Sequence, residues 1–212
     1  DKVVTRLPYS DVENSFNRIA GRLKWTRQED GQEIQGEGIK VVTSDDLNMR
    51  SGKFSIRERK IKQEEWLEGK VLLDEIQLET LGKLSPYFTL PSTFETTLKQ
   101  TNPVGKLTNL ELTWKSKGNA LPQYAIHADF SGLGMNPYKV LSIPGFNNLT
   151  GKLDADQDLG KLALNTQSAT LNFEDVLRWP IPADELTGQI NWKHKHKTLA
   201  IEVKDLVIKN PH

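Results

Sequence analysis

The chain contains no cysteine among its 212 residues, so disulfide bonds, thiol catalysis and zinc–thiolate sites are excluded. It also lacks any run of about 18 apolar residues, the length that a membrane-crossing helix requires. Lysine plus arginine and aspartate plus glutamate both number 28, so bulk charge does not favour a nucleic-acid partner. The chain opens at Asp1 without a signal-peptide pattern, and we expect an internal segment of a longer protein whose membrane anchors lie elsewhere.

The pattern apolar–x–Gly–x–apolar recurs along the chain and predicts a repeated unit. Its glycines are Gly21, Gly69, Gly151 and Gly188, with a looser copy at Gly105. We interpret residues 1–212 as one continuous array of β-units that start near residues 16, 66, 103, 146 and 183. The alternative is that short glycine-containing strand starts recur by chance in an all-β chain.

Apolar residues alternate with polar ones over most of the chain, which is the period of a β-strand. Clear runs are residues 124–130, 169–174, 189–193 and 199–204. Each run predicts a half-buried strand with one polar, solvent-exposed face and one apolar face. Ile34 and Gly36 stand in the opposite phase to Ile39 and Val41, so a bulge between them could exchange the two faces.

Helix signals are few. Leu78, Leu81 and Leu84 recur at threefold spacing within residues 76–87, and Ser92 is a candidate N-cap for a second helix through Lys99. A third short turn is possible over residues 172–178. Two or three short helices cannot cover every apolar strand face, so the strands must either form a two-sheet sandwich or curl around something apolar.

Patterns that would indicate metal binding are incomplete. His194 and His196 have no identifiable third ligand, so a polar turn explains them better. The aspartates at 154, 156 and 158 resemble a calcium loop, but the glycine falls one place late and Asn165 replaces the bidentate glutamate. We therefore expect no metal ion.

The sequence also lacks a nucleophile elbow, a phosphate loop and a dinucleotide fingerprint, so we expect neither a cofactor nor an enzyme. Trp25, Trp114 and Trp192 could bind a glycan by stacking, but we expect these rings to pack against neighbouring units.

Several stretches follow one another in the order found in YhdP-type AsmA-like envelope proteins, and the chain resembles that family best over residues 70–212. Over residues 1–69 the best anchor is Gly21–Trp25. The matching stretches farther on are Pro103–Trp114, Tyr124–Phe130, Leu177–Pro182, Leu186–Trp192 and Asp205–Pro211.

The resemblance implies a mainly β fold, in which a curved antiparallel sheet of repeated units forms an open, taco-like groove. It implies a place in the periplasm of Gram-negative bacteria, as part of a protein anchored in the inner membrane. It also implies transfer of phospholipid between the inner and outer membranes, with acyl chains shielded in the groove and no catalytic residue.

The residues expected to line such a groove are apolar positions of the period-two runs. They are Ile126, Phe130, Leu153, Leu162, Leu164, Leu171, Phe173, Ile190, Leu199, Ile201 and Val203. The same residues could instead form an ordinary closed core. The main functional alternative is a structural spacer of the envelope that binds a protein partner through its sheet edges.

Overall fold

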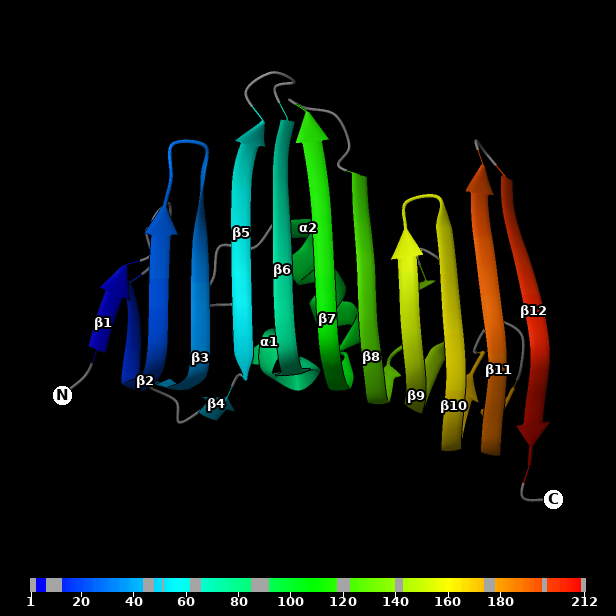
Figure 1. Ribbon diagram of the computed structural model, residues 1–212. Coiled ribbons are helices and arrows are strands. Elements are labelled where there is room, and N and C mark those ends of the chain that lie inside the picture. The colour runs from blue at the N-terminus through cyan, green and yellow to red at the C-terminus, as the bar shows by residue number, and fades with distance from the viewer. Residues whose placement is uncertain are drawn as a thin grey trace.

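The computed structural model describes residues 3–6, 13–43, 48–50, 52–61, 66–84, 92–117, 123–139, 143–173, 178–195 and 198–210. Its strands form one antiparallel sheet in chain order, except that β4 pairs only with β3 (Figure 1). The strands are β1 (Val3–Arg6), β2 (Glu13–Arg27), β3 (Gly31–Thr43), β4 (Asn48–Arg50), β5 (Lys53–Ile61), β6 (Trp66–Gln77), β7 (Val104–Lys117), β8 (Gln123–Met135), β9 (Gly145–Asp156), β10 (Leu159–Asn172), β11 (Ile181–Lys195) and β12 (Thr198–Lys209). The predicted curved antiparallel sheet is confirmed, and it does not close into a barrel.

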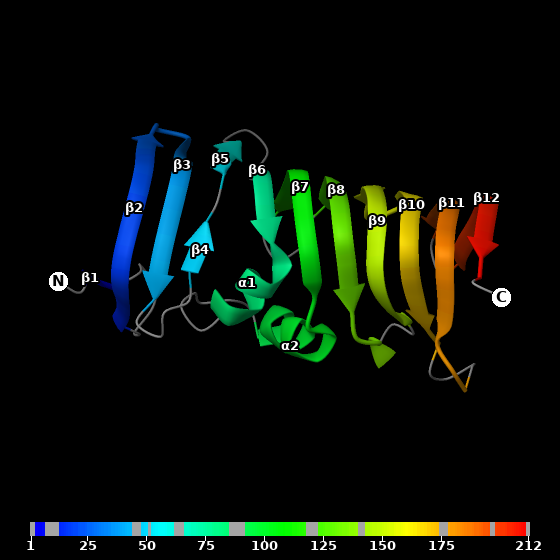
Figure 2. The same cartoon turned by 90° about the horizontal axis from the view of Figure 1, so that it is seen from below.

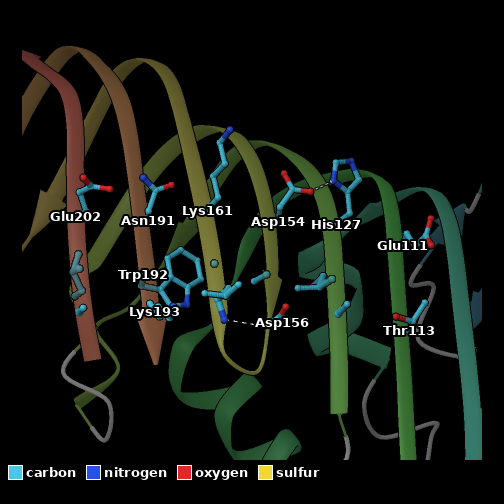
Figure 3. Close-up of a pocket in the computed structure, with 17 residues that line it drawn as sticks. Glu111, Thr113, His127, Asp154, Asp156, Lys161, Asn191, Trp192, Lys193 and Glu202 are labelled. Carbon is cyan, nitrogen blue, oxygen red and sulfur yellow. Dashed lines mark hydrogen bonds and ion pairs between the residues drawn. The ribbon is translucent and has the colours of Figure 1, made fainter. Parts of the chain in front are cut away.

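A line of β-bulges bends the sheet. Gly132, Asn148 and Ser168 have φ angles of 61°, 61° and 58°, and they lie beside one another on β8, β9 and β10. The side-chain amide of Asn148 donates hydrogen bonds to the carbonyls of Gln167 and Ser168, at 3.0 and 3.2 Å, which fixes this alignment. Because a bulge increases local bend and twist, a row of bulges creases the sheet and makes the strands arch (Figure 3).

The bulge expected near the start of the chain is present on β2 and β3. The register between these strands shifts between Ala20 and Arg22, next to Gly21 at φ 139°, and Gly38 has φ 59°. As a result Gly36 pairs with Leu23 while Val41 pairs with Ile19. Apolar residues on both sides of the bulge thus remain on one face despite their opposite phase in the sequence.

Two of the expected helices are present between β6 and β7. Helix α1 covers Leu78–Leu84 and α2 covers Ser92–Thr101. They lie to one side of the sheet (Figures 1 and 2). The Glu79 carboxylate accepts a hydrogen bond from the Gly105 backbone, and the Thr101 carbonyl accepts one from the Asn136 backbone, so both helices are tied to the neighbouring strands. Of the third expected turn, residues 174–177 lie outside the described residues.

Neither described helix is long and apolar enough to span a membrane. The most buried apolar side chains gather along the crease rather than over the whole sheet. This crease cluster consists of Phe130, Leu149, Leu164, Ala169, Ala183 and Leu186. Since most other apolar residues of the same face are only half-buried, the crease is the principal core of the described chain.

The repeat glycines occupy two kinds of position. Antiparallel pairing makes β2, β7, β9 and β11 run in one direction, and these strands carry Gly21, Gly105, Gly151 and Gly188. Gly69 lies on β6, which runs the opposite way. Four of the five glycines therefore sit on equivalent strands, which suits a hairpin-sized repeat; the exact unit boundaries stay a prediction.

Candidate functional site

One unbroken row of apolar residues crosses ten strands of the sheet. Each member pairs directly with the next across the strand-to-strand register, so all of them point to the same face. From β2 to β12 this apolar row consists of Trp25, Ile34, Ile56, Val71, Leu112, Ile126, Ala155, Gly160, Trp192 and Ile201. Nine intervals of about 4.8 Å give the row a length of about 43 Å.

A second apolar row runs beside the first, one step nearer the crease. Across β9 to β12 it consists of Leu153, Leu162, Ile190 and Val203, each paired with the next. At the other end Leu23, Gly36, Phe54, Leu73 and Leu110 are paired in the same way across β2 to β7. Ala128 pairs with Leu153 and brings the row onto β8. With the crease cluster below them, these rows form a wide apolar wall on one face.

The opposite face is polar at the same level. The row that alternates with the two apolar rows runs Lys24, Gln35, Ser55, Leu72, Glu111, His127, Asp154, Lys161, Asn191 and Glu202. Cross-strand ion pairs join several of its members to neighbours, such as Lys70 with Glu111 at 2.6 Å. In Figure 3, Lys161 and His127 point outwards from the arch, so the apolar rows line its inner side. The sheet therefore has a polar outside and an apolar inside.

Most residues predicted to line a groove lie on the inner face. Ile126 and Ile201 belong to the first apolar row, and Leu153, Leu162, Ile190 and Val203 to the second. Leu199 pairs with His194, one step beyond the first row towards the strand ends. Phe173 is half-buried and directly follows the end of β10.

The other three predicted residues are deeper. Phe130 and Leu164 are only 5% and 8% exposed, and both belong to the crease cluster, against which Leu171 packs. These residues pack together along the crease and stabilise the parts of the sheet on either side of it. Their burial leaves the two apolar rows as the accessible surface.

The prediction missed the first half of the inner face. Ile34, Ile56, Val71 and Leu112 complete the apolar row there, and none was proposed from the sequence. The alternation Leu110, Leu112, Trp114 is as regular as the runs that were used, so this signal was available. The continuous row could not be predicted from the sequence, because it depends on the register of every strand pair.

Apolar side chains of the inner face are exposed to solvent in the described chain. Trp25 on β2 is 62% exposed and Ile201 on β12 is 61% exposed. Large apolar side chains rarely remain exposed in a continuous patch on a soluble monomer unless something covers them. The apolar rows are therefore the candidate binding surface of the described chain.

A separate hollow of about 720 Å³ crosses β7 to β12. Of its 17 lining residues, 12 occupy strand positions that point to the outer face, so the hollow lies on that face (Figure 3). Several of its charged groups are already paired: His127 contacts Asp154, and the Asp156 carboxylate accepts hydrogen bonds from the backbones of Asp158 and Leu159, both at 2.7 Å. No cluster of metal-ligating side chains exists among the described residues.

Nearby on the same face, hydrogen bonds from Asn109 and Lys152 lower the pKa of Asp129. A similar effect lowers the pKa of Glu33, through hydrogen bonds from Gln35, Ser55 and Arg57. Both carboxylates are thereby held in the charged form as parts of cross-strand networks, which is a structural role.

Comparisons with known proteins identify the family. The family model described as YhdP protein matches residues 1–212. The comparisons with curated proteins and with solved structures gave no match. Because the family match covers the whole chain, the protein belongs to the YhdP family of bacterial envelope proteins.

Proposed function

We propose that this chain is a groove segment that shields phospholipid acyl chains on their way between the inner and outer membranes. The observation that carries the proposal is the apolar row, which crosses ten strands without a polar residue. Its neighbour row on the same face is apolar as well, and the alternating row on the other face is mostly polar. A surface for sliding acyl chains requires this continuity, whereas an ordinary protein contact does not.

The energetics are those of hydrocarbon in water. Each exposed methylene costs about 0.8 kcal/mol, so an unshielded acyl chain costs on the order of ten kcal/mol. A single leaflet of a bilayer is about 15 Å of hydrocarbon, so the 43 Å row is about three acyl-chain lengths long. A lipid could therefore move along it in steps without returning its chains to water, while its head group stays in solvent on the open side.

This role requires no catalysis, cofactor or metal ion. It places the chain in the periplasm, and the membranes would be contacted by parts of the protein outside this segment. The family's place in the bacterial envelope supports that location. The two rows of the inner face are apolar along the described strands, which suits a ligand recognised by its chains, so we expect weak selectivity among phospholipids.

A second candidate function is that of an envelope spacer that pairs with a protein partner. It would use an edge strand, and within the described sheet β12 has this position with all of its residues exposed. Such edges recruit additional strands. This function would use the edge of the sheet and leave the apolar rows free of lipid.

The test is site-specific photo-crosslinking in the intact protein in living cells, with lipid detected by mass spectrometry. Photoreactive residues are placed at Leu162 and Ile201, which face inwards, and at Lys161 and Glu202, their outward neighbours. Phospholipid captured at the first pair but not at the second is expected. Equal capture at both pairs, or none at either in a folded protein, would contradict the proposal, and protein captured along β12 would favour the spacer.

A further inference from the structure

Three glycines occupy strand positions that no backbone requirement explains. Gly36, Gly69 and Gly160 lie inside β3, β6 and near the start of β10, and none has the positive φ angle that favours glycine. Glycine weakens a strand because it loses more conformational freedom on folding and packs no side chain. Another constraint must therefore exclude a side chain at these positions.

That constraint is an aromatic ring on the adjacent strand. Gly36 pairs with Phe54, Gly69 with Trp114 and Gly160 with Trp192. A Cβ atom added at the glycine would lie 2.2 Å from the Phe54 ring and 1.9 Å from either tryptophan ring. Each ring thus occupies the side-chain space of its paired glycine and lies down over the neighbouring strand.

All three rings lie on the inner face. Trp192 belongs to the first apolar row, Phe54 to the second, and Trp114 pairs with Gly69 one step beyond the first row. Laid over the glycines, the rings are half-buried. Trp25, whose direct partner is Ile34 rather than glycine, remains 62% exposed. A glycine opposite an aromatic residue thus leaves the space in which the ring lies close to the sheet.

We infer that these glycines set the clearance of the groove: they hold the large aromatic residues flat so that acyl chains can pass. The inference rests on the proposed lipid role. Any side chain at the glycine would push the ring away from the sheet and into the volume that an acyl chain must use. Gly36, Gly69 and Gly160 are thus positioning residues that act through Phe54, Trp114 and Trp192.

The experiment compares lipid capture on the two sides of the Gly160–Trp192 pair. In the intact protein in cells, photoreactive residues at Ile126 and at Ile201 report phospholipid in the same apolar row, on β8 and on β12. In Gly160→Ala we expect the ratio of capture at these positions, per folded protein, to change several-fold. Trp192→Ala alone is the reference for loss of the ring, and because Gly160→Ala/Trp192→Ala has no ring to displace, we expect its capture ratio to equal that of Trp192→Ala.

The outcomes separate the possible failures. An unchanged ratio in folded Gly160→Ala, or an effect of Gly160→Ala that is as large without the Trp192 ring as with it, would overturn the clearance role while the lipid role stands. Absence of lipid at both positions in the unsubstituted protein would overturn the lipid role and this inference with it. Should Gly160→Ala not accumulate as folded protein, Gly69→Ala with and without Trp114→Ala provides the same test at β6 and β7.

Discussion

Substituting alanine for each of two leucines should show which apolar residues contribute most to the free energy of unfolding of this sheet. Leu186 and Leu199 both contribute apolar surface, but Leu186 is 2% exposed in the crease cluster and Leu199 is 57% exposed on β12. Leu186→Ala leaves a cavity among packed side chains, and such changes cost about 3 kcal/mol. Leu199→Ala removes a side chain that is mostly hydrated already, so its cost should be within about 0.5 kcal/mol.

Urea unfolding of the 212-residue chain, followed by circular dichroism, measures both changes. With a slope of about 2 to 3 kcal/mol/M for a chain of this size, Leu186→Ala should lower the midpoint by about 1 to 1.5 M. Leu199→Ala should shift it by no more than about 0.25 M. Equal shifts for the two variants would refute the view that the crease is the core and the rows are a free surface.

Further predictions concern the charge networks and the bulges. Because hydrogen bonds from Asn109 and Lys152 lower the pKa of Asp129, its contribution to stability is present above its unfolded pKa of about 3.9 and is lost as pH falls through the lower folded pKa. Urea midpoints measured from pH 6 downwards should therefore fall less steeply in Asp129→Asn than in the unsubstituted chain. Ser168 has φ 58°, so Ser168→Gly should raise the thermal midpoint, with a gain of about 0.5 to 1 kcal/mol, and Ser168→Val should lower it. The opposite order of these two midpoints would show that the left-handed conformation at the bulge is not retained.

The alternation of apolar and polar residues was enough to predict the strands and which of their residues share one face of the sheet. It worked for residues such as Leu162, Ile190 and Ile201 because a period of two has only one structural interpretation. Helix α1 was likewise predicted from Leu78, Leu81 and Leu84, since threefold spacing does not suit a strand. The reversal of phase between Ile34 and Val41 also indicated its bulge, because only an inserted residue returns both to one face.

The crease could not be predicted in the same way. Two of the residues that form it, Asn148 and Ser168, have left-handed backbone conformations without being glycine, and such conformations are uncommon enough that the sequence does not locate them. Phe130 and Leu164 are buried in the cluster that lies along that bend, which alternation alone does not indicate. Alternation therefore identifies a face, but the fold of the sheet decides which part of the face becomes core and which remains surface.

This division explains how a sheet can keep a long apolar surface open without losing stability. The crease cluster is narrow and contains side chains from β8 to β11. It can therefore stabilise the sheet on both sides of the crease while the neighbouring apolar rows remain half-buried. Had the rows themselves been the core, a second layer would have had to cover them, and no continuous surface would remain for a ligand. Residues of the rows should therefore tolerate changes of size that the crease does not, and the proposed lipid role accounts for their apolar character better than folding does.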